Sequence, residues 1–160
     1  MGLASGGVLV VDKPGDWSSA QVVDRVKRRL GVRKAGHAGT LDPFATGVLV
    51  VLLNSATRLA RFLLADGKVY EARMRLGEET DTQDLTGRVL RREPVRPMEA
   101  QALRTVLERF EGSQEQLPPV YSALKHQGMP LYRLARQGRP VQKAARRVHI
   151  DRLRLRSLNW

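Results

Sequence analysis

An uninterrupted apolar run, GVLVVLL at residues 47–53, is the sequence feature that most restricts how this chain can fold. The run is far too short to span a bilayer. A continuous stretch of valine and leucine, without polar alternation, is typical of a strand that is covered on both faces. We therefore expect a buried strand here, and a second one at residues 7–11, where GVLVV has the same character.

Helical periodicity predicts the neighbouring elements. Ser18 or Ser19 can cap a helix that runs to about Leu30 and ends at Gly31. The face opposite its apolar stripe is cationic and carries Arg25, Lys27, Arg28 and Arg29. Three more helices are predicted: one capped by Ser55 with Leu59, Phe62 and Leu63 inward, one from Pro97 to Gly112, and one at about residues 130–137.

Alternating residues predict two further strands. In Lys68–Leu76 one face is apolar and is expected to point inward; it consists of Tyr70, Ala72, Met74 and Leu76. Residues 146–158 are also strand-like, but their apolar residues change from even-numbered to odd-numbered positions. This change predicts a bulge near Asp151 or Arg152. Strands joined by turns and mixed irregularly with helices favour an α+β fold with a mainly antiparallel mixed sheet flanked by helices, in one domain at residues 1–160.

Charge indicates the kind of partner. Lysine and arginine total 28 against 16 acidic residues, so the net charge is +12 and the pI is about 11.1. This excess predicts a polyanion, above all a nucleic acid, and argues against a membrane surface, since no helix combines a broad aromatic face with a basic one. Cysteine is absent, which excludes disulfides and thiol chemistry and fits a cytoplasmic protein.

One loop, GHAGTLDPFATG at residues 36–47, stands out because a single carboxylate lies among many backbone-breaking residues. Pro43 biases Asp42 towards extended geometry, and Gly36 and Gly39 permit tight turns and close approach of a ligand. A carboxylate held in this way can act as a base, a nucleophile or a metal ligand. It can also simply cap a turn, and the residues alone favour that interpretation.

Other kinds of catalytic or binding site have weaker support in the sequence. His37 and Asp42, together with Asp81 and Asp84 on another loop, could hold a hard cation, but no HxxxH or HxH spacing supports a metal site. A GxSxG elbow and glycine-rich phosphate motifs are absent. Tyr70 is expected to pack in the core, although in an RNA-binding protein it could stack on an extruded base.

Taken in order, several segments resemble the TruB type of pseudouridine synthase over nearly the whole chain. They are VLVVDKPGDWSS, GHAGTLDPFATGVLVV, SATR, KVYEARMRLGEETDTQDLTG and PPVYSALKHQGMPLYRLARQG. The resemblance implies an isomerase that converts one uridine of the TΨC loop of tRNA, uridine 55, to pseudouridine after base flipping, without a metal or an organic cofactor. It also implies that Asp42 is the nucleophile of a covalent mechanism.

The resemblance assigns four further residues. Tyr70 matches a tyrosine that stacks on the flipped uracil and can assist proton removal, and His37 matches a histidine that enters the RNA loop. Asp84 matches a loop aspartate near the uracil. Arg58 stands where a lysine is common in the family, and we expect it to contact the substrate.

The end of the chain departs from the family pattern. A motif of the CSxGTYxR kind, whose arginine pairs with the catalytic aspartate, is absent. We therefore expect residues 1–160 to be the N-terminal part of the catalytic domain, incomplete at its C-terminus and without the small C-terminal RNA-binding domain. The alternative is a catalytically impaired tRNA-binding fragment or RNA-folding helper. In either case the expected partner is the TΨC stem-loop, bound by a monomer.

Overall fold

A computed structural model describes residues 6–122 and 124–160, whose contacts divide the chain into two compact units. Unit 1 ends at Glu71 and unit 2 begins at Ala72. Each unit contains both helices and strands, and every strand pairing among the described residues is antiparallel. This confirms the α+β class, while a single catalytic domain over residues 1–160 stays a prediction.

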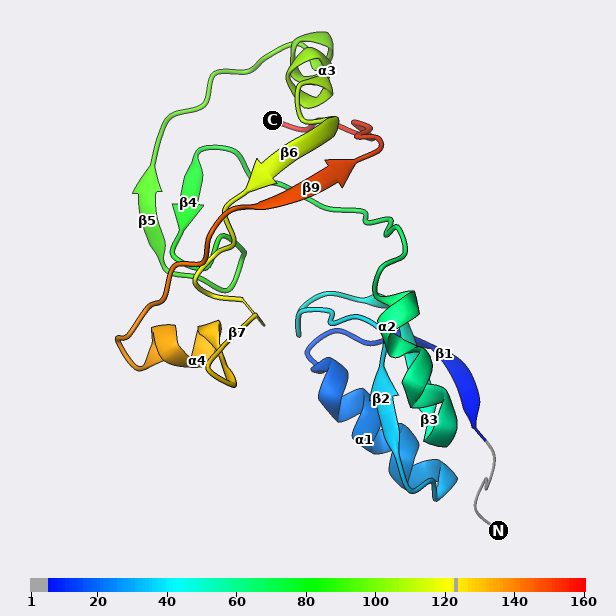
Figure 1. The fold of residues 1–160 in the computed structure, drawn as a ribbon. Coiled ribbons are helices and arrows are strands. Elements are labelled where there is room, and N and C mark those ends of the chain that lie inside the picture. The colour runs from blue at the N-terminus through cyan, green and yellow to red at the C-terminus, as the bar shows by residue number, and fades with distance from the viewer. Residues whose placement is uncertain (1–5, 123) are drawn as a thin grey trace. The chain divides into compact units, whose positions relative to one another are not determined.

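The sheet of unit 1 consists of β1 (Gly7–Lys13), β3 (Gly47–Leu53) and β2 (Ala35–His37), with β3 in the centre (Figure 1). Both apolar runs are therefore strands, as predicted. Lys13 lies opposite Gly47 in the β1–β3 register, and His37 lies opposite Val51 in the β2–β3 register. The loop at residues 38–46 consequently leaves the sheet at the same end at which β1 finishes.

Helix α1 (Ser19–Leu30) has the predicted boundaries because both of its ends are capped. The Ser18 hydroxyl accepts a hydrogen bond from the Gln21 backbone N–H, and the Gln21 side chain accepts one from the Ser18 N–H, which completes a capping box. At the other end Gly31 adopts φ 62°, a left-handed conformation that glycine adopts readily.

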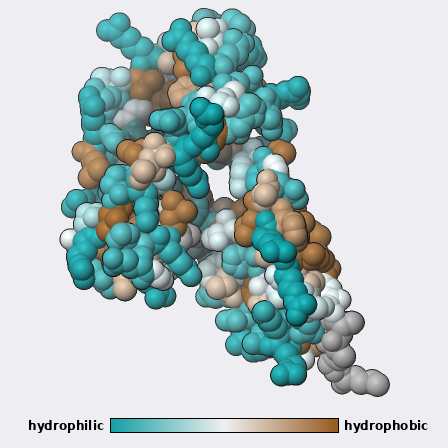
Figure 2. Space-filling view, in the orientation of Figure 1, coloured by the Kyte–Doolittle hydropathy of each residue, from teal (hydrophilic) through white to brown (hydrophobic). Residues whose placement is uncertain are grey.

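Helix α1 covers one face of this sheet and forms the core of unit 1. Val22 and Val23 of the helix pack with Leu49, Val51 and Leu53 of β3. The opposite face is only partly covered: Val8, Val10 and Val48 are 53%, 66% and 70% exposed. Figure 2 shows apolar side chains, in brown, gathered over the part of unit 1 that holds α2 and β1. The prediction that residues 47–53 are buried on both faces is therefore wrong at Val48, and the burial predicted for residues 7–11 is wrong at Val8, Leu9 and Val10.

The helix expected after Ser55 takes a different form. A 3-10 helix, η1 (Asn54–Leu59), is followed by a single turn, α2 (Ala60–Leu63). The chain turns at Asn54, whose N–H donates to the Lys34 carbonyl, so Ser55 does not cap a helix. Leu59 and Phe62 are exposed rather than inward, because a 3-10 turn of three residues breaks the 3.6-residue apolar stripe.

Among the residues that the structure describes, unit 2 contains three two-stranded sheets and two helices. They are β4 (Glu78–Thr80) with β5 (Val89–Arg92), β6 (Gly112–Gln116) with β9 (Arg146–Ile150), β7 (Lys125–His126) with β8 (Met129–Pro130), α3 (Ala100–Glu108) and α4 (Leu131–Arg136). In the described part of the chain, no helix is both long and apolar enough to cross a membrane.

Two strand predictions are wrong. Residues 67–75 form no strand, and Tyr70 and Met74 are 71% and 77% exposed instead of inward. Alternation produces a strand only where a second strand supplies hydrogen bonds, and no described strand pairs with this segment. At the C-terminus β9 ends at Ile150, so the change of parity at Asp151 marks the end of a strand rather than a bulge.

Candidate functional site

The loop that carries Asp42 connects β2 to β3 and is bounded by two glycines with positive φ. Gly39 has φ 123° and Gly47 has φ 116°. An added Cβ at either position would meet no atom within 4 Å, so the backbone conformation itself requires glycine there. These two positions let the chain leave the sheet and return to it sharply.

Asp42 is exposed on this loop, and its backbone carbonyl accepts a hydrogen bond of 3.1 Å from the Ala45 N–H. Within residues 6–122 and 124–160, no hydrogen bond or ion pair engages its carboxylate. The turn is therefore closed by backbone, not by the side chain. This argues against the interpretation that Asp42 merely caps a turn, and it leaves both carboxylate oxygens accessible to a ligand.

The residue before Asp42 is held by the start of α1. Ser19 is 2% exposed, and its hydroxyl accepts from the Leu41 N–H at 3.0 Å and donates to the Leu41 carbonyl at 3.2 Å. One side chain thus satisfies both backbone polar groups of Leu41. Because Ser19 belongs to a capped helix, Leu41 is fixed relative to the core.

The residue after Asp42 is held by a fully buried lysine. Lys13 is 0% exposed, and its ammonium donates to the carbonyls of Pro43 at 3.0 Å, Pro14 at 2.8 Å and Trp17 at 2.5 Å. An ammonium has three N–H donors, so three carbonyl acceptors saturate it. A buried charge is tolerated only with such compensation. Lys13 therefore anchors the loop to the end of β1.

Sequence reasoning missed Lys13 and the loop contact of Ser19. The signal for Lys13 was its parity: it shares the α1-facing side of β1 with Leu9 and Val11, where a solvated lysine does not fit. Asp42 thus lies between two neighbours that are held by hydrogen bonds, while its own side chain is exposed.

Removing the Ser19 hydroxyl is expected to loosen this loop. Ser19→Ala leaves the N–H and the carbonyl of Leu41 without a partner, and we expect it to lower the free energy of unfolding by about 1–3 kcal/mol in urea denaturation. Ser18→Ala is the matched control, because it removes the cap of the same helix at a cost of about 1 kcal/mol without touching the loop. Exchange of the Leu41 amide hydrogen that is equally fast in both variants would contradict this role of Ser19.

His37 ends β2, four residues before Leu41, and its ring is partly buried. Its Nδ1 is one of the buried side-chain polar atoms that have no hydrogen-bond partner among the described residues. A buried ring nitrogen without a partner is unfavourable, so a hydrogen bond that reached this atom would stabilise the segment. The β2–β3 connection thus brings His37 and Asp42 together on one short segment.

Two other predicted site residues are exposed and lie apart from this loop in sequence. Arg58 belongs to η1, which packs beside β2, where Thr57 lies near Gly36. Tyr70 lies in the irregular segment that ends unit 1. Neither side chain has a hydrogen bond, ion pair or ring contact with Asp42 or His37 in the described structure. The inward orientation predicted for Tyr70 is wrong, and its exposure leaves the ring free to stack.

Asp84 lies in unit 2, in the turn between β4 and β5. One of its carboxylate oxygens accepts from the Thr82 hydroxyl at 2.8 Å, the Thr86 hydroxyl at 2.6 Å and the Thr86 N–H at 2.8 Å. Burial alone would raise the pKa of Asp84, but these bonds, from the Thr86 side chain first, lower it below its ordinary value. These hydrogen bonds therefore stabilise the folded chain when the pH is above the ordinary pKa of an aspartate. The stabilisation is lost as the pH falls through the lowered pKa of Asp84.

The same turn has no room for a larger residue at Gly87, where a Cβ would lie 2.2 Å from the Thr82 hydroxyl and 2.7 Å from the Asp81 carboxylate. Asp81 is itself engaged, since it accepts from the Arg88 N–H at 2.8 Å. The two aspartates of TDTQD are therefore tied to their own turn. Across the described residues, no group of three histidine or acidic side chains is arranged to hold a metal ion.

The chain is similar to known proteins in sequence and in fold. A family model described as TruB family pseudouridylate synthase, N-terminal domain, matches residues 27–160. The chain belongs to the TruB family. The match includes the Asp42 loop, Arg58, Tyr70 and Asp84, so the resemblance read from the motifs is confirmed.

Relatives named tRNA pseudouridine synthase B are similar over almost the whole chain. The one from Syntrophotalea carbinolica is 50% identical over 149 residues, which are 93% of this chain and 49% of the relative. The one from Bordetella pertussis is 48% identical over 160 residues, 99% of this chain and 66% of the relative. The chain thus spans about half to two thirds of the length of the TruB relatives that it matches.

A solved structure agrees with this assignment. The crystal structure of a Cbf5–Nop10–Gar1 complex contains a chain that is 30% identical and superposes with a TM-score of 0.50, covering 74% of this chain and 31% of that one. Together with the family match, this likeness confirms the α+β pseudouridine synthase fold of the TruB family.

Proposed function

We propose that this chain is the part of a TruB-type tRNA pseudouridine synthase that carries the nucleophile, and that it acts on uridine 55 in the TΨC loop. The observation that carries the proposal is the Asp42 loop. Leu41 and Pro43 are tied to the core by Ser19 and Lys13, while the Asp42 carboxylate itself is exposed and unengaged within the described chain. Holding a reactive group in one place in this way lowers the entropic part of a barrier.

In the proposed reaction, the Asp42 carboxylate attacks either the uracil ring or the sugar. The bond between ribose C1′ and N1 breaks, the base turns, and a bond forms between C1′ and C5. C5 loses its hydrogen, N1 gains one, and the product has the composition of the substrate. A covalent intermediate suits this isomerisation because it keeps the fragments together while the base reorients.

The remaining site residues have roles in RNA recognition in this proposal. The target base must leave its stack before a carboxylate can reach it, and a loop substrate lowers that cost. His37, on the same connection as Asp42, enters the opened RNA loop, and the exposed Tyr70 ring stacks on the flipped base. Asp84 and Arg58 are proposed to contact the substrate. The net charge of +12 supplies phosphate affinity.

One observation favours a second candidate function. The Asp42 carboxylate has no cationic partner among the described residues. An oxyanion without a paired cation is harder to keep ionised when a substrate excludes water from it. A tRNA-binding fragment or RNA-folding helper with little turnover is therefore the alternative. We propose in both cases a cytoplasmic monomer.

Release of tritium separates the two candidates. The chain is incubated with tRNA transcripts that carry tritium at uridine C5, and RNA binding is measured in parallel by fluorescence anisotropy. Release of about one tritium per tRNA supports the synthase, because only the target uridine loses its C5 hydrogen. Tight binding with no release would favour the fragment.

Chelation is expected to leave the rate of release unchanged. The proposed chemistry uses a carboxylate and no metal, so an excess of EDTA should alter the initial rate by less than about twofold at constant ionic strength. The ionic strength is matched because RNA affinity depends on salt. Strong inhibition that zinc or magnesium reverses would contradict the metal-free mechanism.

A further inference from the structure

A dense group of cations lies at the C-terminal end of α1, away from the Asp42 loop. Residues 24–34 contain six cationic side chains and one carboxylate, and all seven are exposed. The α1 patch consists of Arg25, Lys27, Arg28, Arg29, Arg33 and Lys34. Within the part of the chain that the structure describes, none of these cations forms an ion pair.

The electrostatics of the helix end do not account for this patch. Cations in a last turn favour the negative end of the helix dipole, which explains Lys27, Arg28 and Arg29 at most. The carbonyls of Lys27 and Arg28 are already satisfied by the backbone N–H groups of Val32 and Gly31. Arg25 and Arg29 are like charges four residues apart, a pairing that destabilises a helix. The chain therefore keeps an unfavourable charge density that an external polyanion would neutralise.

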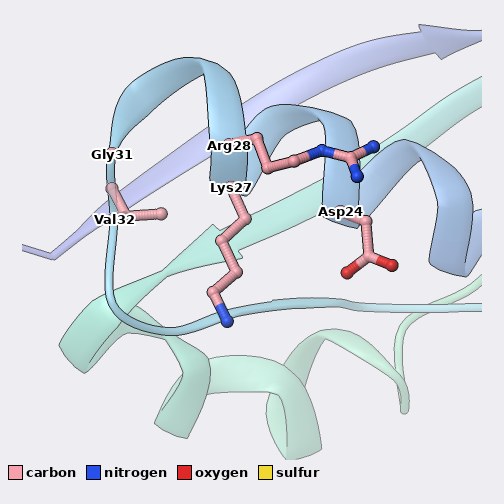
Figure 3. Close-up of a pocket in the computed structure, with 5 residues that line it drawn as sticks. All are labelled: Asp24, Lys27, Arg28, Gly31 and Val32. Atoms are coloured by element: carbon pink, nitrogen blue, oxygen red, sulfur yellow. The ribbon is translucent and has the colours of Figure 1, made fainter.

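The patch also has a shape that suits a phosphate group. An open pocket of about 540 Å³ lies at the end of the helix and is lined by Asp24, Lys27, Arg28, Gly31 and Val32. Figure 3 shows the Lys27 ammonium and the Arg28 guanidinium extending in different directions from the helix, with the Asp24 carboxylate nearer to Arg28. Gly31 adds no side chain to this pocket, so the attraction for an anion comes from Lys27 and Arg28 and must exceed the repulsion from the negative end of the helix dipole.

Helix α1 sets the distance between this pocket and the proposed chemistry. Ser19 at its first residue holds the Asp42 loop, and the pocket lies at its last turn. A helix of 12 residues is about 18 Å long. That length corresponds to about five stacked nucleotides at roughly 3.4 Å a step, as in duplex DNA. RNA bound at the pocket is therefore not the flipped nucleotide but backbone several steps away.

We propose that the α1 patch binds the sugar-phosphate backbone of the paired stem next to the target loop, with a phosphate in the Lys27–Arg28 pocket. The proposal rests on the proposed function, because a tRNA stem is the polyanion that this activity brings to the protein. The contact is not sequence-specific: it adds affinity and sets the orientation of the stem, while the loop and the flipped base are recognised elsewhere.

A charge-neutral triple variant tests the proposal. Lys27→Gln, Arg28→Gln and Arg33→Gln are combined in the full chain, and binding of a fluorescent TΨC stem-loop is measured over a salt series. We expect Kd to rise at least about tenfold and the slope of log K against log salt to fall by about 2, since each lost phosphate contact removes about 0.7–0.9. Binding of the loop alone, without its stem, should not change. Thermal unfolding checks that the variant is folded.

The matched control removes the same charge from unit 2. Arg147→Gln, Arg152→Gln and Arg154→Gln replace three exposed cations that have no ion pair in the described structure. The proposal is supported if this control changes Kd by less than about threefold. The proposal is overturned if both triple variants weaken RNA binding equally. It is also overturned if the patch variant weakens binding of the loop alone as much as binding of the stem-loop, or if it does not weaken RNA binding at all. Loss of binding to phosphatidylserine vesicles by a patch variant that still binds RNA normally would overturn it too, because the patch would then serve a membrane.

Tritium release distinguishes failure of this inference from failure of the proposed function. Normal RNA binding by the patch variant, together with release by the unmodified chain, overturns the inference alone. Patch-dependent RNA binding without any release from the unmodified chain supports the inference and overturns the synthase.

Discussion

Asp42→Asn is expected to abolish tritium release from C5-labelled tRNA, with a fall of at least about 10³-fold in the rate at saturating RNA. Such a fall corresponds to about 4 kcal/mol of barrier. An amide cannot form the covalent intermediate that the proposed reaction requires, although it has almost the same shape as the carboxylate. The binding of tRNA should change by less than about threefold, because the removed charge is negative and opposes phosphate.

The fold should not change in this variant. Within the described residues no partner engages the Asp42 carboxylate, and the loop is held by its neighbours instead. The unfolding temperature of Asp42→Asn is therefore expected to match that of the unmodified chain within about 2 °C. Asp66→Asn is the control, since Asp66 is an exposed carboxylate in a turn outside the site. Release that persists in Asp42→Asn and equals that of the control would rule out Asp42 as the nucleophile.

The elements that the sequence predicted correctly are those whose determinants are local. Helix α1 has a serine at its start, a glycine at its end and an apolar stripe between them, and its boundaries agree with the prediction. The Asp42 loop was also identified from its glycines and proline. In both cases the decisive interactions join residues that are close in sequence, so the local sequence pattern is enough to predict them.

The elements that were predicted wrongly depend on distant partners. The segment around Tyr70 alternates like a strand, but a strand forms only where another one pairs with it, and residues 67–75 are irregular. Likewise Leu59 and Phe62 follow a helical pattern, yet the turn at Asn54 produces a 3-10 helix with both side chains exposed. The spacing of residues along the chain does not reveal such contacts between distant segments.

The contacts of the candidate site could be predicted only in part, for the same reason. Asp42 and His37 belong to one short connection and could be found together. Lys13 is 30 positions away from Pro43 in sequence, and lysine is the residue type least expected in a core. Only the structure shows that its ammonium lies under the loop. Its burial makes it the residue on which the stability and the alignment of the site most depend.

Lys13→Met is accordingly expected to be the most destabilising of the substitutions considered. Methionine fills a similar volume but donates no hydrogen bond, so the carbonyls of Pro14, Trp17 and Pro43 lose their shared donor. The loss of these three charge-assisted hydrogen bonds outweighs the relief of the lysine's own desolvation, and we expect a loss of about 2–4 kcal/mol in urea denaturation. Lys68→Met is the matched control, because the Lys68 ammonium also donates to two carbonyls but is exposed; its effect should stay within about 0.5 kcal/mol.

Kinetics then separate a loss of stability from a loss of alignment. Well below the unfolding temperature of Lys13→Met, a residue that only stabilised the fold would leave turnover per folded molecule unchanged. If Lys13 positions Asp42, tritium release at saturating RNA should fall by about 10-fold to 100-fold while KM for tRNA changes little, because a displacement of about 1 Å at the reacting group can cost about 10²-fold. A raised KM with unchanged turnover would instead place the role of Lys13 in RNA binding and contradict its assignment as the anchor of the catalytic loop.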